Sequence, residues 1–364
     1  MGVLIKNELI KLRGKKASWI MQIILVVGMF GMAFMMLNSN ENMKVYFQRE
    51  EQEEFKGGMT AYKAADGTLI SQEQFWNTED GNYDDIQPVS LTLEESITLL
   101  ESSIQTYKSQ PKKYDKQTIK LAEKELAYYQ AYKEQGEIPQ DPNVGTTSAA
   151  FFSSYGQIYV LSTLFAVIVA SMIIASEFSG GTIKLLLTRP YSRLQILWSK
   201  YIVTILYGLM TSVVMAMSAF AFSFILPSQS LLVPLSSATG TKTALTMAGQ
   251  LFASNTLLMI LYITIAFFFS AVIRSQALAV GVGMGVLFSG SILGQILPGF
   301  IEKYDWLKWI IFNLLGLNNQ VLDVNYLTGG SLSIPATATG IIIYIVLIQT
   351  ATLVIFNKRD VALS

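Results

Sequence analysis

Six long apolar stretches divide the chain into alternating apolar and polar segments. Each holds about 20 residues, the length that a helix needs to cross a hydrocarbon core of about 30 Å. None carries Lys, Arg, Asp or Glu in its interior, and the apolar residues run continuously instead of alternating. Continuous runs favour helices over barrel strands. The pattern predicts an all-α membrane protein with six transmembrane helices, at 18–37, 153–176, 200–226, 251–273, 276–298 and 336–356.

Basic residues gather in alternate polar segments. Segments 1–17, 177–199 and 357–364 are rich in Lys and Arg and contain three acidic residues, Glu8, Glu177 and Asp360. Lys and Arg are enriched in cytoplasmic loops. These segments, and therefore both termini, are predicted to face the cytoplasm. The outer side then comprises 38–152, 227–250 and 299–335.

Composition agrees with this interpretation and excludes several kinds of chemistry. The chain is 51% hydrophobic, has a mean hydropathy of +0.41 and is 14% charged, whereas soluble domains carry about 25% charged residues. It has no Cys and no His, so disulfides, thiolate zinc sites and His bases are excluded. A P-loop motif is absent. We therefore expect a multi-pass protein of a bacterial cytoplasmic membrane that is not an enzyme and binds no cofactor, metal or nucleic acid.

The first seventeen residues combine apolar and basic positions at helical spacing. A helix here would lie on the membrane surface with its apolar side toward the lipid. The alternative is a plain basic anchor that only sets the orientation. The expected apolar face contains Val3, Ile5, Leu9, Ile10 and Leu12, with Lys6, Lys11 and Arg13 elsewhere.

Residues 38–152 form a large outer insertion that carries 20 acidic and 11 basic residues. Its first part is expected to prolong the first span. A capping box at Thr92 and Glu95 and a cap at Asp115 predict a helical hairpin that ends near Gly136. Residues 57–90, rich in Gly, Asp, Asn and Thr, are expected to be loop. The acidic excess favours cationic partners, and the alternative is a hairpin that is merely solvated.

The cytoplasmic segment 177–199 is the most informative of the polar segments. Gly180 and Gly181 allow a sharp turn, Pro190 ends the apolar stretch that follows, and Ser192 can cap the third span. The intervening apolar residues need a surface that buries them. Two interpretations stay open: a short helix docked into a groove on a cytoplasmic partner, or a hairpin packed on the membrane or on the N-terminal helix.

This segment resembles the cytoplasmic loop of type-2 ABC transporter permeases, and the resemblance extends to the order of the spans along most of the chain. In that family the short helix after the second span is the coupling helix, which sits on a separate ATPase subunit. The long insertion at 38–152 departs from the short turn of many members and leaves the cargo open. The coupling residues implied by the resemblance are Glu177, Gly181, Thr182, Ile183, Lys184, Leu185, Leu186, Leu187, Pro190 and Arg193.

The resemblance implies the permease subunit of an ATP-driven exporter of a hydrophobic or amphipathic cargo, such as a peptide antibiotic, a lipid-linked intermediate or a drug. ATP and Mg²⁺ would bind the cytoplasmic ABC ATPase partner, and a second copy or a sibling permease would complete the pathway in the lipid bilayer. The alternative is a membrane sensor or scaffold whose outer hairpin binds a ligand and signals to a cytoplasmic partner.

Two features near the outer side and inside the spans have two interpretations each. The family places re-entrant helices at 299–335, where the alternative is an aromatic belt at the membrane interface. Polar residues on apolar spans form hydrogen bonds between helices or line a pathway. Those residues are Asn255, Gln295 and Gln349.

Overall fold

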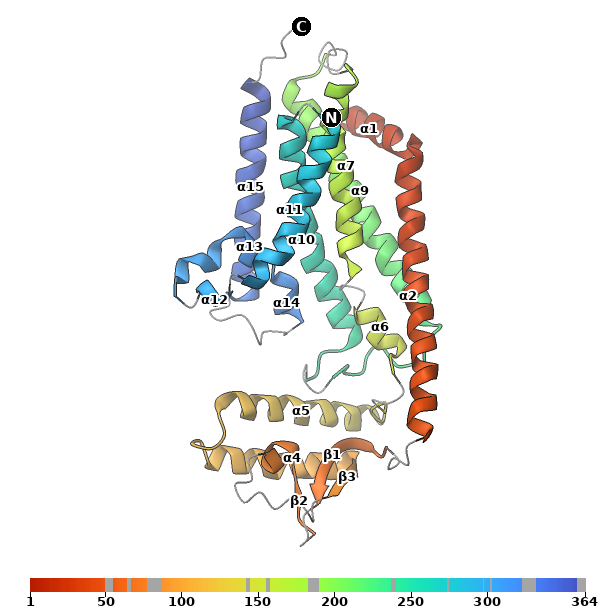
Figure 1. The fold of residues 1–364 in the computed structure, drawn as a ribbon, viewed down its shortest axis with the longest axis vertical. Helices are drawn as coiled ribbons and strands as arrows, with labels where there is room; N and C mark the ends of the chain where they lie inside the picture. Colours follow the sequence, from red (N-terminus) through yellow and green to blue (C-terminus); the bar gives the residue numbers. More distant parts are fainter. Residues whose placement is uncertain are drawn as a thin grey trace. The chain divides into compact units, whose positions relative to one another are not determined.

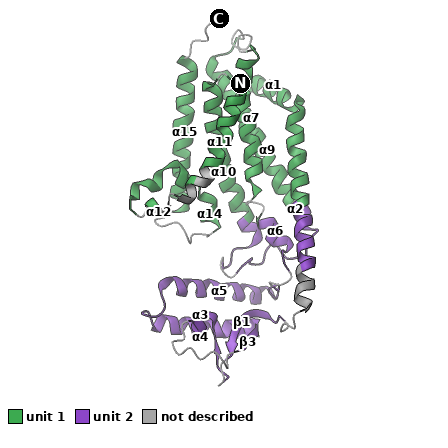
Figure 2. Ribbon diagram, viewed as in Figure 1, with its two compact units in different colours: residues 1–31, 154–221, 248–364 green, residues 32–153, 222–247 purple. Residues whose placement is uncertain are grey.

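The computed structural model is mostly helical and divides into two compact units (Figures 1 and 2). Unit 1 comprises 1–31, 154–221 and 248–364, and unit 2 comprises 32–153 and 222–247. The structure describes residues 1–49, 55–63, 67–76, 87–141, 145–154, 158–182, 190–236, 240–273, 275–296, 298–301, 303–322 and 332–358.

Unit 1 is a bundle of long apolar helices. The N-terminal helix α1 and the C-terminal end of α15 lie at the same end of this bundle (Figure 1). Five helices of the described chain are long and apolar enough to cross a membrane, which makes this a multi-pass membrane protein. The long elements are α1 (Gly2–Gly14), α2 (Lys16–Arg49, continuing into unit 2), α7 (Val160–Ser179), α9 (Arg193–Ser223), α10 (Ala244–Val272), α11 (Gln276–Ile296) and α15 (Ile334–Lys358).

The fifth predicted span, 276–298, corresponds to α11 and is not among these five helices. Its described apolar part, Gln276–Ser289, is shorter than a membrane span, so the count of six stays a prediction. Most of the other helices extend beyond the predicted apolar runs because caps, and not hydropathy, end a helix. α9 begins at Arg193 because Ser192 and Gln195 form a reciprocal cap. The backbone N–H of Gln195 donates to Ser192 Oγ at 3.2 Å, and the backbone N–H of Ser192 donates to Gln195 Oε1 at 3.1 Å. α7 begins later than predicted, at Val160, after the separate helix α6 (Ser148–Ser154).

The described chain between α11 and α15 contains four short helical elements: α12 (Pro298–Ile301), the 3₁₀ helix η4 (Asp305–Trp309), α13 (Ile311–Leu314) and α14 (Leu317–Val321). Leu314 and Leu317 are buried against Leu258 and Leu261 of α10 and Ile341 of α15. Leu258 lies 14 residues from either end of α10, which is about 21 Å at 1.5 Å per residue. The short helices therefore reach the middle of α10 along its length.

The polar residues of this segment are bonded to the long helices. Ser254 Oγ donates to Asn318 Oδ1 at 2.7 Å, and the Asn318 amide donates to Asn255 Oδ1. Asn255 therefore forms a hydrogen bond between helices, which is the first of the two interpretations given for the polar residues of the spans. Gln349 is 5% exposed, and its amide has no partner among the described residues. The side chain of Gln295 lies outside the described part.

Unit 2 contains the predicted helical hairpin. α4 (Leu93–Ser109) starts with the Thr92–Glu95 capping box, α5 (Lys116–Gln135) is capped by Asp115, and Gly136 ends it in a left-handed conformation. The prediction of a loop at 57–90 is wrong in part. The chain there contributes to an antiparallel sheet in the order β2-β1-β3, and α3 (Gln72–Trp76) lies beside this sheet. The protein is therefore mostly helical and not all-α. The strands are β1 (Gly57–Lys63), β2 (Leu69–Ile70) and β3 (Gln87–Thr92).

The segment before α10 is attached to the hairpin within unit 2. The Tyr132 hydroxyl on α5 donates to the Pro234 carbonyl at 2.9 Å and accepts from the Gln229 amide at 3.1 Å. Tyr132 is 1% exposed, so both bonds are shielded from water. The chain between α9 and α10 is therefore held by α5.

Candidate functional site

The cytoplasmic loop predicted at 177–199 begins and ends on helices. Glu177 lies in the last turn of α7, not in the loop, and Gly181 turns the chain with a φ of +69°. The Thr182 hydroxyl donates back to the Glu177 carboxylate. Pro190 lies just before α9, and Arg193 is its first residue. The other predicted coupling residues, Ile183, Lys184, Leu185, Leu186 and Leu187, lie outside the described residues.

A network of four charged side chains joins both ends of this loop to the N-terminal helix. Lys200, in the second turn of α9, donates to Glu177 Oε1 at 3.1 Å and to Glu8 Oε2 of α1 at 3.0 Å. Lys11, one turn after Glu8, lies 3.4 Å from Glu8 Oε1 and 3.3 Å from Glu177 Oε1. Two carboxylates and two ammonium groups therefore neutralise each other. We call Glu8, Lys11, Glu177 and Lys200 the four-charge network.

The network is buried on one side and exposed on the other. The side chain of Lys200 is 3% exposed and that of Lys11 is 48% exposed. A buried ammonium without partners would be costly, whereas two carboxylates within 3.1 Å satisfy its charge. Lys200 therefore binds α1, α7 and α9 together at one point.

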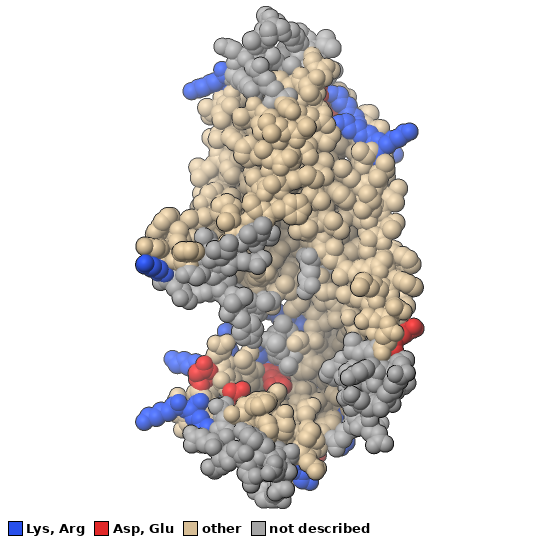
Figure 3. Space-filling view, viewed as in Figure 1, with Lys and Arg blue, Asp and Glu red and all other residues tan. Residues whose placement is uncertain are grey.

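In α1 the apolar residue that is buried differs from the expected apolar face. Leu4, which was not counted in the apolar face, is 5% exposed, whereas Val3 and Ile10 are 62% and 59% exposed. Leu4 and Glu8 are one turn apart and share the side that packs on the protein. The exposed side chains of Val3 and Ile10 are available to contact lipid, which agrees with a helix on a membrane surface. Figure 3 shows Lys and Arg gathered over α1, next to an uncharged surface on the bundle.

Sequence reasoning named Glu177 and missed the rest of the network. One signal was present in the chain: the segments predicted to be cytoplasmic hold three acidic residues, and two of them, Glu8 and Glu177, belong to the network. A carboxylate in a strongly basic segment needs a specific partner. Which lysine supplies it depends on the packing of α1 against α7 and α9.

A cleft of about 710 Å³ lies beside the end of α7. Its walls come from the C-terminal half of α7 and the first turns of α11, and no charged residue of the described chain lines it. Met172 and Val280 provide apolar surface, while Ser179, Ser275 and Gln276 provide polar groups. Such a surface suits apolar side chains with a few hydrogen bonds.

The fold and the site define a multi-pass membrane protein whose N-terminal helix is ion-paired to the end of α7 and to the second turn of α9. Residues 116–362 match the family described as "Protein of unknown function (DUF2705)", and the chain belongs to this family. It is 29% identical to "Uncharacterized protein YhcI" of Bacillus subtilis (strain 168) over 74% of this chain and 86% of that protein. It is 28% identical to "Uncharacterized membrane protein YdbK" of the same organism over 42% of this chain and 59% of that protein.

Proposed function

We propose that this chain is the permease subunit of an ATP-driven exporter, moved by a separate cytoplasmic ATPase. The observation that carries the proposal is the four-charge network at the root of the cytoplasmic loop. Helix α7 ends at that loop and helix α9 begins after it. Lys200 of α9 lies 3.0 Å from the Glu8 carboxylate on α1 and 3.1 Å from the Glu177 carboxylate on α7. A displacement of the loop would therefore be transmitted to three helices at once.

The transmission would act through the short connections on both sides of the loop. Gly181, with its φ of +69°, supplies the turn after α7, and the Ser192–Gln195 cap fixes the start of α9. When the ATPase pair closes on ATP and Mg²⁺, residues 183–189 would move with it. The network would then change the packing of α7 against α9 instead of letting the loop move alone.

The short helices before α15 support a closed outer side. Leu314 and Leu317 pack against the middle of α10, about 21 Å from its ends, which is the depth expected of re-entrant helices. With α11 as a sixth span, one copy would supply half of a pathway, and a second copy or sibling permease would supply the rest. The cargo would be hydrophobic or amphipathic, because the described spans carry no charged residue away from their ends.

A pull-down from native membranes tests this proposal. The detergent-solubilised chain is expected to bring down a P-loop ATPase, and the triple variant Leu185→Asp, Leu186→Asp, Leu187→Asp is expected to lose it. Leu232→Asp, at a 62% exposed position before α10, is the matched control and should retain the ATPase. A folded native chain that recovers no ATPase would overturn the proposal.

The alternative is a sensor or scaffold that signals to a cytoplasmic partner. The bonds of Tyr132 favour it, because they connect the hairpin to the segment that leads into α10. ATPase turnover separates the two functions. A permease should change the turnover of its partner ATPase in proteoliposomes, whereas a scaffold should leave it unchanged.

A further inference from the structure

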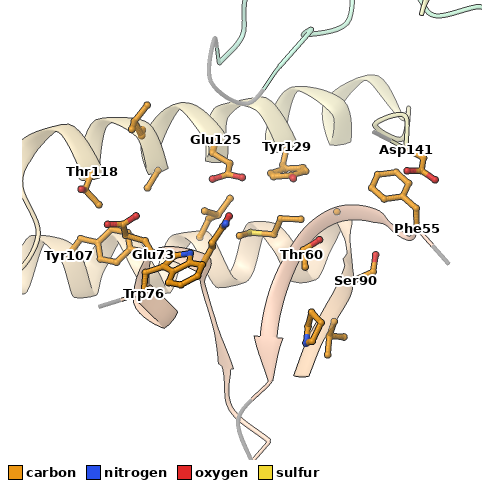
Figure 4. Close-up of a pocket in the computed structure, with 18 residues that line it drawn as sticks. Phe55, Thr60, Glu73, Trp76, Ser90, Tyr107, Thr118, Glu125, Tyr129 and Asp141 are labelled. Atoms are coloured by element: carbon orange, nitrogen blue, oxygen red, sulfur yellow. The ribbon is translucent and has the colours of Figure 1, made fainter. Parts of the chain in front are cut away.

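Unit 2 contains a cleft of about 1010 Å³ between α5, α3 and the sheet (Figure 4). This volume is at the upper end of the range of about 300–1,000 Å³ that is usual for small-ligand sites. α5 forms one wall with Glu125 and Tyr129, and α3 forms another with Glu73 and Trp76. The hairpin and the sheet thus enclose more space than their mutual packing requires.

Every charged side chain that lines the cleft in the described chain is acidic. These residues are Glu73, Glu125 and Asp141, which come from α3, α5 and the segment after α5. Glu125 points from the middle of α5 toward the cleft (Figure 4). It is half-buried and, among the described residues, has neither a hydrogen bond nor a cationic partner. Burial raises the pKa of its carboxyl group above the ordinary value.

The cleft also offers aromatic and apolar surface beside these carboxylates. Trp76 is 65% exposed although it is large and apolar, and Tyr107, Tyr129 and Met59 line the wall behind it. Aromatic faces attract organic cations, and indole does so most strongly. A simple metal ion would leave this apolar surface unused.

We propose that this cleft binds an organic cation with an apolar body. The ammonium group would lie near the Glu125 carboxylate, and the apolar body would lie against Trp76 and Met59. The positive charge would satisfy a carboxylate that has no partner among the described residues, and the body would cover an exposed indole. The inference does not depend on the exporter proposal, because binding is measured on the chain alone.

Calorimetric titration of the full chain in zwitterionic nanodiscs tests the inference. Benzyltrimethylammonium is the probe, and neopentylbenzene is its uncharged isostere. The cation is expected to bind and the neutral isostere is not. Glu125→Gln should weaken binding about tenfold, because the attraction between the trimethylammonium charge and the carboxylate is lost. Glu123→Gln is the matched control, since it removes the same charge from the same helix without lining the cleft, and it should bind as the native chain does.

Tryptophan fluorescence gives a second measurement that does not depend on Glu125. Saturating cation should change the emission of the native chain, and Trp76→Phe should lose that change. Because Trp76 is 65% exposed, this variant leaves the fold intact. Equal binding of the neutral isostere, or unchanged affinity in both Glu125→Gln and Trp76→Phe, would overturn the inference. Tighter binding of a lysine–leucine peptide than of benzyltrimethylammonium would identify peptides as the source of the cation, and the reverse order would identify small amines.

Discussion

At the scale of single residues, Lys200 has the largest consequence for the end of the bundle that holds α1. Its side chain is 3% exposed and touches carboxylates from two other helices. A buried ion pair adds little net stability, but removing one partner leaves an unpaired charge that is costly. The four-charge network is therefore best understood as a device that fixes one arrangement of three helices.

Replacing Lys200 with Met should destabilise the folded state by about 3–5 kcal/mol, because Glu8 and Glu177 lose their shared partner. Denaturant unfolding in mixed micelles measures this change. The double variant Lys200→Met with Glu177→Gln should recover part of the loss, as coupled residues do. Lys133→Met removes an exposed pair with Glu94 and should cost less than about 1 kcal/mol. Equal losses for the two lysines would show that the network is not coupled.

Glu125 predicts a dependence of cation binding on pH. Burial raises the pKa of this carboxyl group, so it becomes protonated at a higher pH than an ordinary Glu. Below that raised pKa the neutral carboxyl no longer attracts a cation, and affinity should fall as the pH falls. Glu73 and Asp141 face the same cleft. Titrations of cation affinity from about pH 4 to about pH 8 should show a transition that disappears in Glu125→Gln.

The raised pKa of Glu125 affects folding stability in the opposite direction from cation affinity. The folded state binds the Glu125 proton more tightly than the unfolded state does, so stability is greatest below the ordinary pKa. It declines as the pH rises through the window between the ordinary and the raised pKa. Glu125→Gln should flatten this decline, which thermal unfolding at several pH values would measure.

At the scale of elements, side-chain caps decided where helices begin. The Thr92–Glu95 box and the Asp115 cap were found in the sequence because the residue types and spacing are specific. The strands at 57–63 and 87–92 were missed because Gly and Pro within them resemble a loop. These two strands pair although they are far apart in the chain, and a pattern of neighbouring residues does not predict such pairing.

The short helices before α15 lead to a prediction about packing. Leu314 is fully buried between α10 and α15, so Leu314→Ala should leave a cavity and cost about 2–5 kcal/mol. Trp306→Ala, at a 66% exposed position in the same segment, should cost less than about 1 kcal/mol in micelles, since exposed substitutions rarely change stability. Unfolding in detergent compares the two. Similar values would mean that the segment does not pack as the structure has it.

At the scale of the whole molecule, charge distribution and apolar helices agree on a membrane protein with polar ends. The basic α1 and the end of α15 share one end of unit 1 (Figure 1). The acidic insertion forms a compact unit of its own with the chain between α9 and α10. Such sorting of charge has a reason in a membrane and none in a soluble helical bundle.

The absence of native cysteine makes the topology directly testable. Single substitutions Lys6→Cys and Lys358→Cys, both at exposed positions, should react with a membrane-impermeant maleimide only after the cells are opened. Lys116→Cys in unit 2 should react in intact cells. Labelling of Lys6→Cys in intact cells would contradict the cytoplasmic termini, and protection of Lys116→Cys would contradict an outer insertion.

The sequence by itself determined the apolar helices and the hairpin with its caps. These features depend on local composition and on spacings of a few residues, which physical chemistry converts directly into helices and turns. Only the tertiary structure decided the partners of Lys200, the sheet of unit 2, the packing of Leu314 against α10 and the acidic, aromatic cleft. Each of these brings together residues that are distant in the chain, and the apolar pattern is compatible with many such arrangements.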